Sequence, residues 1–199
     1  GGRIMADPAY IVDGVLTDGE AWVGIATTTL GVDTATVTFT STDDGQVGDF
    51  SQYMDLVLVI YARTAGAGST DREMNMQLNN DTGTNYNAQK LRGYGSGLNA
   101  AATSGAVRFT IGQNPSTNAG ANIFGATVTH LFDINSGKYK SGISQTACDM
   151  DGSGATELWA LTWKSQAPIT EIDLYDLYGS DLLTASKFSL FGVLPRMVA

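Results

Sequence analysis

Short segments in which apolar and polar residues alternate recur along most of the chain. The segment 34–40 alternates threonines with Ala35, Val37 and Phe39, and the segment 74–78 alternates Met and Leu with Asn and Gln. This period of two is that of a half-buried antiparallel strand. The pattern therefore predicts a chain that consists mainly of strands.

Three longer segments indicate where the core lies. Residues 56–61 are apolar at every position, which predicts a central strand buried on both faces. In the segment 124–134, alternate positions are apolar apart from His130, so we expect them to face inward with His130 as a core histidine. The segment 159–163 predicts a second inward face, formed by Trp159, Leu161 and Trp163.

Turn-forming residues separate these segments. Gly, Asn and Asp tolerate positive φ, and they cluster at 43–45, 80–83, 135–137 and 151–154. Regular short strands with such punctuation predict an all-β fold, an antiparallel, jelly-roll-like β-sandwich of about nine to eleven strands. We interpret residues 168–183 as strand rather than as a short helix, because of their Thr, Ile and Tyr content.

Longer connections and the domain boundary follow from composition. We expect loops at 64–70, 93–105 and 113–120. Residues 1–20 are rich in Gly and Asp with scattered apolar residues, which indicates an N-terminal arm, and residues 21–199 form the sandwich domain. Met5 is either the encoded start or the remnant of a trimmed chain.

The charge excludes several partners. The formal net charge is −9, whereas nucleic acids and anionic membrane surfaces attract clustered Lys and Arg. No apolar run has the length of a membrane span. Cys148 is the only cysteine, so no internal disulfide can form, which favours a cell interior or a particle assembled there.

Candidate catalytic chemistry is sparse. His130 is the only histidine, and neither a Gly-x-Ser-x-Gly elbow nor a phosphate-binding loop is present. The sequence therefore predicts neither an enzyme nor a bound cofactor. Paired carboxylates, at 43–44 and at Asp173 with Asp176, leave a polysaccharide-acting enzyme as the one catalytic alternative.

A weak calcium candidate lies at 149–157. Asp149, Asp151 and Ser153 occupy the first, third and fifth positions of an EF-hand-like loop, and Gly154 occupies the sixth. The twelfth position is alanine where a bidentate Glu is required, and Glu157 at the ninth can compensate only in part. A hairpin turn with acidic side chains is the simpler interpretation, so we predict no metal.

Aromatic residues in Asn-rich regions suggest a second kind of surface. Aromatic rings stack on sugars and amides bond their hydroxyls, whereas tyrosine also suits core and interface positions. The tyrosines in question are Tyr86, Tyr94, Tyr139, Tyr175 and Tyr178.

Four segments resemble those of a type of small virion protein of tailed bacteriophages. Residues 22–40 are similar to its opening strand pair, 53–63 to its central strand, 77–95 to its Asn-Asp-x-Gly-x-Asn-Tyr turn with the next strand, and 188–193 to its closing strand. The resemblance implies a β-sandwich on the particle, as a capsid decoration or cement protein or as part of a tail or fibre. It carries no catalytic or binding residue.

Together these observations predict a virion structural protein. We expect a capsid decoration or cement protein that binds the major capsid protein or other virion proteins as a symmetric homo-oligomer. The alternative is a tail, fibre or host-recognition module that binds surface glycans.

Overall fold

The chain folds as an antiparallel β-sandwich, as the sequence predicts. The structure is a computed structural model that describes residues 11–12, 15–16, 22–150 and 152–194. Within these residues there are fourteen strands and one short 3-10 helix, η1 (Phe50–Gln52). The strands are β1 (Ile11–Val12), β2 (Val15–Leu16), β3 (Trp22–Thr29), β4 (Thr36–Thr40), β5 (Asp55–Ala62), β6 (Asp71–Leu78), β7 (Tyr86–Tyr94), β8 (Gly97–Ala106), β9 (Phe109–Pro115), β10 (Gly125–Phe132), β11 (Lys140–Asp149), β12 (Gly154–Trp163), β13 (Glu171–Asp176) and β14 (Lys187–Val193).

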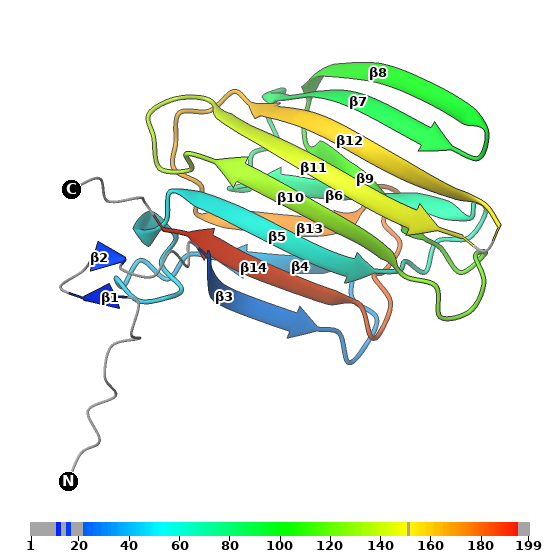
Figure 1. Cartoon of the computed structure of the whole chain (residues 1–199), viewed down its shortest axis with the longest axis horizontal. Coiled ribbons are helices and arrows are strands. Elements are labelled where there is room, and N and C mark those ends of the chain that lie inside the picture. The colour runs from blue at the N-terminus through cyan, green and yellow to red at the C-terminus, as the bar shows by residue number, and fades with distance from the viewer. Residues whose placement is uncertain (1–10, 13–14, 17–21, 151, 195–199) are drawn as a thin grey trace, which may run out of the picture.

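Two sheets of unequal width form the sandwich. The wide sheet has eight strands in the order β3-β14-β5-β10-β11-β12-β7-β8, and the narrow sheet has four in the order β4-β13-β6-β9. Figure 1 looks onto the wide sheet, with the narrow sheet behind it. The chain passes repeatedly from one sheet to the other, so that many neighbouring strands, such as β3 and β14, come from distant parts of the sequence, as in a jelly roll.

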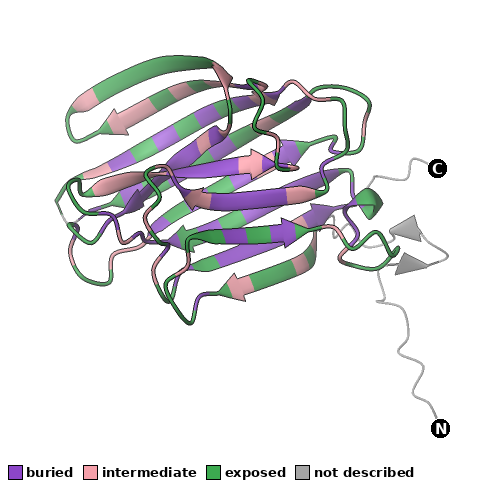
Figure 2. Ribbon diagram, turned by 180° about the vertical axis from the view of Figure 1, so that it is seen from behind, coloured by how far each residue is buried: buried purple, intermediate pink, exposed green. Residues whose placement is uncertain are grey.

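The main hydrophobic core lies between the two sheets. Alternate residues of β5 and β14 meet alternate residues of β6 and β13 there, which confirms the period-two pattern. Burial along the strands is visible in Figure 2, which shows the molecule from the side of the narrow sheet. Fully buried members include Leu56, Leu58, Ile60, Met74, Met76, Leu78, Ile172, Leu174, Phe188 and Leu190.

Several sequence-based expectations differ from the structure. The expected loop at 93–105 contains most of β8, which is one reason why the strands outnumber the predicted nine to eleven. Ala35 precedes β4 and is exposed. Most of the predicted arm, residues 1–20, lies outside the described residues; its described part is the antiparallel pair β1–β2.

No helix in the described part of the chain is long and apolar enough to cross a membrane.

Candidate functional site: an uncovered apolar sheet face

The outer face of the wide sheet exposes many large apolar side chains. They come from seven of its eight strands, and neither strands of the narrow sheet nor any other described element cover them. Val128 and Leu158 are 41% and 43% exposed, and Leu98 on the edge strand is 84% exposed. We call this surface the apolar sheet face; its large exposed members are Trp22, Val59, Tyr61, Leu91, Leu98, Val128, Phe132, Ile143 and Leu158.

Aromatic pairs extend this face across neighbouring strands. Tyr61 stacks on Phe124 with ring centroids 5.0 Å apart, and Trp22 lies against Phe191 at 6.0 Å. Eight strands about 4.8 Å apart, each contributing about seven residues, give the whole sheet face an area of about 900 Å², of which the apolar side chains cover part. Single exposed apolar residues need no explanation, but patches above a few hundred Å² mark interaction sites.

Charged groups are confined to the ends of the strands on this face. Lys187 is the first residue of β14, Asp149 the last of β11 and Asp55 the first of β5. By contrast, the outer face of the narrow sheet carries acidic side chains within its strands, among them Asp173, which accepts a bond from Thr38 at 2.6 Å. The middle of the apolar sheet face is therefore free of acidic side chains.

The phase of β10 is opposite to the sequence-based expectation. We predicted that Ala126, Val128 and His130 face the core, but the residues between them, Thr127 and Thr129, are the buried ones. His130 lies on the outer face at the end of the strand, with Nε2 2.9 Å from Oδ2 of Asp55 and its ring stacked on Phe132. The prediction of an inward apolar face and a core histidine was wrong.

A close approach of β9 explains this inversion. Gly112 of β9 has φ +154°, and a Cβ there would lie 1.8 Å from Oγ1 of Thr146. Only small side chains fit beneath such a backbone, and their hydroxyls are satisfied there: Ser144 donates to the Ile111 carbonyl at 2.5 Å and pairs with Thr129 at 2.8 Å. Hydroxyls therefore occupy the middle of the inner face of β10 and β11, and Ala126, Val128 and Ile143 lie on the outer face.

Residues 56–61, which we predicted to be buried on both faces, also expose apolar side chains on the outer face. Along β5, Leu56, Val57 and Leu58 are fully buried, but Val59 and Tyr61 are exposed on the apolar sheet face. A hollow of about 700 Å³ on this face is lined by residues of β7, β8, β10, β11 and β12, including Leu91, Leu98 and Val128.

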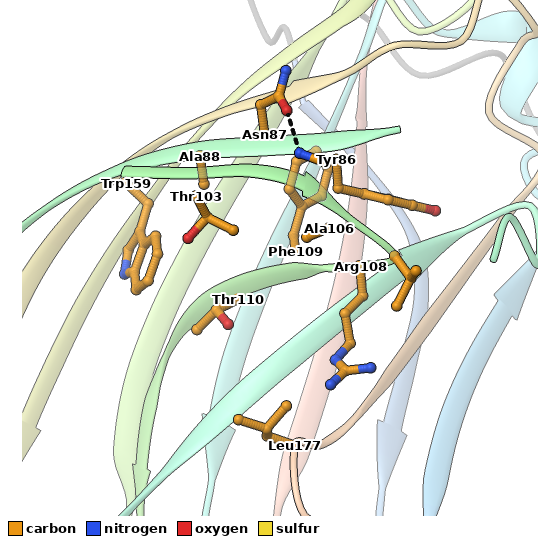
Figure 3. A pocket seen from close by; sticks show the side chains of 12 residues that line it. Tyr86, Asn87, Ala88, Thr103, Ala106, Arg108, Phe109, Thr110, Trp159 and Leu177 are labelled. Atoms are coloured by element: carbon orange, nitrogen blue, oxygen red, sulfur yellow. Dashed lines mark hydrogen bonds between the residues drawn. The ribbon is translucent and has the colours of Figure 1, made fainter. Parts of the chain in front are cut away.

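A second cavity lies on the opposite side of the wide sheet, beneath the β7–β8 hairpin. It measures about 340 Å³ and is lined by the rings of Tyr86, Phe109 and Trp159 together with Arg108 and Asn87. Figure 3 shows these side chains around the cavity, with Oδ1 of Asn87 accepting a bond from the Gly105 amide at 2.9 Å.

The weak calcium ligands are not brought together. Asp149 lies on the outer face at the end of β11, whereas Glu157 points to the inner face of β12 with no exposed side-chain area. The Met150 amide donates to the Ser153 carbonyl at 2.7 Å, which closes a tight turn, and Asp151 lies outside the described residues. Among the residues that the structure describes, no group of three or more His, Cys, Asp or Glu side chains is placed to hold a metal ion.

The paired carboxylates each bond to groups in their own turns and neighbouring strands rather than converging on a common site. Asp44 accepts bonds from Thr42 and the Gln46 amide, which hold the pKa of that carboxyl below its ordinary value. Asp176 is buried against Arg72 and the amides of the following turn, whereas Asp173 lies on the outer face of the narrow sheet. The geometry gives neither pair the arrangement of a glycosidase site.

The five tyrosines do not share a surface. Tyr86 is fully buried, with its hydroxyl donating to the Leu78 carbonyl at 3.2 Å. Tyr94 and Tyr178 are exposed beneath different guanidinium groups, those of Arg92 and Arg72.

Cys148 is buried, and burial raises the pKa of its thiol to about 12, which keeps it protonated and unreactive.

Glu157 is a buried charge that sequence reasoning did not single out as structural. Its Oε2 accepts from Nε1 of Trp159 at 2.8 Å, and its Oε1 lies 3.2 Å from Nε of Arg92 without hydrogen-bond alignment. Burial raises the pKa of Glu157, and the Trp159 bond with the charges of Arg92 and Lys90 offsets only part of that effect.

Glu157→Gln should therefore change how stability depends on pH. A carboxyl with a raised folded-state pKa contributes stability that is fully present below its unfolded pKa of about 4.3 and is lost as pH rises through the folded pKa. We expect the Tm of the natural chain to fall relative to that of Glu157→Gln between pH 4 and pH 7. Thermal unfolding of both proteins across this range tests it, and a constant difference would contradict it.

Comparison with known proteins gives little further information. No protein-family model matches the chain, and no curated protein matches it. Among solved structures, the CBM40 module of the Ruminococcus gnavus IT-sialidase, bound to α2,3-sialyllactose, is similar with a TM-score of 0.28 and 7% sequence identity, over 89% of this chain and 94% of that chain. A likeness this slight carries no conclusion about function.

The apolar sheet face was not foreseen as a site. Its signal was present in the sequence as the apolar alternation of residues 124–134, which we assigned to the core.

Proposed function

We propose that this chain is a virion structural protein of a tailed phage, a capsid decoration or cement protein that docks its apolar sheet face onto the assembled shell. The observation that carries the proposal is the face itself, an area of about 900 Å² without charge between its strand ends. A standard protein–protein interface buries about 800 Å² on each partner, so this one face is large enough for stable docking.

The nature of the face favours a protein partner. Its large side chains are aliphatic and aromatic, and the residues between them, such as Gln145 and Thr156, are uncharged, which suits an interface with a protein. Two antiparallel sheets held by packing provide the rigid support that such a surface needs. The resemblance to tailed-phage virion proteins supports a place on the phage particle, and the apolar sheet face supports the mode of attachment to it.

Charges placed on the face should abolish shell binding. The variant Val128→Asp/Leu158→Asp changes two exposed side chains, so the fold should survive while two carboxylates would be buried on docking. We expect shells assembled without the chain to bind the natural protein. Their affinity for this variant should be lower by a factor of about 100 or more. Cosedimentation with shells measures both affinities.

The matched control carries the same charge change elsewhere. Val32 is exposed in the segment before β4, and Thr36 is exposed at the start of β4 in the narrow sheet. The variant Val32→Asp/Thr36→Asp should therefore bind like the natural protein. The proposal fails if the natural protein does not bind shells, or if both variants lose binding equally.

A tail or host-recognition module that binds glycans is the second candidate function. The cavity beneath the β7–β8 hairpin favours it, because a guanidinium and an amide line a hollow above buried aromatic rings, and such polar groups can bond sugar hydroxyls. Signal on a glycan array that disappears in Arg108→Ala would favour this candidate over shell docking.

A further inference from the structure

The edge strand β8 is the least supported strand of the wide sheet. It pairs only with β7, and its residues are exposed or half-buried along its whole length, on both of its faces. Its free edge presents backbone amides and carbonyls without a strand partner in the described residues. Figure 1 shows β7 and β8 at one border of the sheet, beyond the strands of the narrow sheet.

Most of this edge lacks the features that keep sheet edges from pairing. Natural edge strands carry Lys, Pro, inward charges or bulges, or they are short. A bulge interrupts the pairing with β7 only at the end of β8, and the run from Gly97 to Thr103 pairs regularly. Neither a charged residue nor a proline occurs between Arg92 and Arg108, and β8 is ten residues long. For a chain with a net charge of −9, this is also a border along which two copies can approach with little repulsion.

The opposite border of the sheet is different. Strand β3 is also uncharged, but Val23 and Ile25 pack against the core, so one of its faces is already covered. Strand β8 has no such cover and gains more from a second strand, because an isolated hairpin is marginal and further strands stabilise it.

We propose that β8 pairs antiparallel with β8 of a second copy of this chain. The two copies are related by a two-fold axis perpendicular to the sheet, because that symmetry makes an edge strand antiparallel to itself. The wide sheets then form one continuous sheet, and both apolar sheet faces lie on the same side. This pairing uses an edge that shell docking leaves free, so it goes beyond the proposed function.

The side chains near the expected axis suit this pairing. The middle of β8 is the run Asn99-Ala100-Ala101-Ala102-Thr103, in which every residue is small or uncharged. Antiparallel pairing about this run places alanines opposite alanines and amides opposite hydroxyls, without steric or charge conflict.

Sedimentation of the full chain tests the proposal. At about 100 µM, where a complex with a Kd of about 10 µM is mostly formed, the natural chain should have twice its 20.9 kDa mass. The variant Ala100→Lys/Ala102→Lys should be monomeric, because pairing about Ala101 places positions 100 and 102 of the two copies opposite one another, so that four like charges meet across the axis. On β7 these positions lie opposite Leu91 and Gln89, so the β7–β8 pair gains no like-charge contact. The variant also brings the net charge closer to zero, so loss of the dimer would not reflect general repulsion.

Two controls separate this edge from other interfaces. Ala26→Lys/Thr29→Lys adds the same charge to exposed positions of β3 and should leave the dimer intact. A monomeric natural chain, a dimer that survives lysines on β8, or a dimer that lysines on β3 also dissociate would each overturn the proposal. A dimer lost only in Val128→Asp/Leu158→Asp would indicate face-to-face packing instead and would overturn it as well.

Cysteine cross-linking tests the symmetry directly. A residue nearest the axis lies opposite the same residue of the other copy, with the two Cβ atoms about 5 Å apart. We therefore place single cysteines at each position from 99 to 103 in turn. Under oxidation, the variants whose cysteine lies nearest the axis should form disulfide-linked dimers. Cys148 is buried and should not contribute, and Gln89→Cys on β7 is the negative control. If none of the five variants cross-links, the two-fold pairing is wrong.

The outcomes for this pairing and for shell docking are separable. A monomer that binds shells would overturn the pairing alone, and a β8-linked dimer that does not bind shells would overturn the proposed function alone.

Discussion

Replacement of Trp163 by alanine should lower the free energy of unfolding by about 3–5 kcal/mol. The indole is 2% exposed and stacks on Tyr86, whose ring meets Phe109 edge-on at 4.9 Å. Its Nε1 also donates to Oδ2 of Asp81 at 2.7 Å. The substitution leaves a cavity in the core and removes one of the bonds that hold the turn after β6.

Part of the stability lost in Trp163→Ala comes from the hydrogen bond between Trp163 and the Asp81 carboxylate. Burial would raise the pKa of Asp81, but the bonds from Asn85, Trp163 and the Gly83 amide together lower it. Trp163→Phe keeps a six-membered ring but loses the pyrrole part of the indole together with the Nε1 bond, so its loss should be smaller than that of alanine. Urea unfolding of the two variants measures both losses.

Trp22 provides the matched control for this prediction. It is 49% exposed at the border of the apolar sheet face, so Trp22→Ala should change the free energy of unfolding by less than about 1 kcal/mol. Equal losses for Trp22→Ala and Trp163→Ala would contradict the assignment of the core.

The core was predictable where alternation coincided with burial by the second sheet. Met74, Met76 and Leu78 on β6, and Trp159, Leu161 and Trp163 on β12, face inward as their spacing indicates. In these strands one side is polar or exposed, so hydrophobicity and burial agree, and the period alone is sufficient.

The phase of β10 was not predictable from its own residues. Thr127 and Thr129 are inward only because Gly112 brings the backbone of β9 close enough to bond neighbouring hydroxyls on β11. That contact joins residues distant in the sequence, and the alternation itself contains no sign of it. A one-residue shift of phase moves a whole apolar set from core to surface, which is why the apolar sheet face was missed.

Strand β8 was missed for a different reason. Its Gly, Ala, Ser and Asn residues have weak strand propensity, and they indicate a loop when considered alone. The strand forms because β7 offers it a partner, from Tyr94 opposite Gly97 to Tyr86 opposite Ala106. Propensity therefore failed at the border of the sheet that we propose pairs with a second copy.

Replacement of Gly192 by alanine should be destabilising by about 3 kcal/mol or more, at the upper end of overpacking effects. A Cβ at this position would lie 2.2 Å from Cδ1 of Tyr53 and 2.3 Å from its Cγ. The Tyr53 ring is 4% exposed, and its hydroxyl donates to the Val47 carbonyl at 2.8 Å, so the ring cannot move aside without breaking that bond.

The neighbouring strand supplies a control for glycine replacement in the same sheet. Gly24 of β3 lies opposite Phe191, and a Cβ there would meet only a ring carbon at 3.9 Å, so Gly24→Ala should be close to neutral. In a Tyr53→Ala background, Gly192→Ala should lose most of its cost, because the clashing ring is gone. Chemical unfolding of the single and double variants gives the coupling between positions 53 and 192, and a coupling near zero would show that the ring is not the cause.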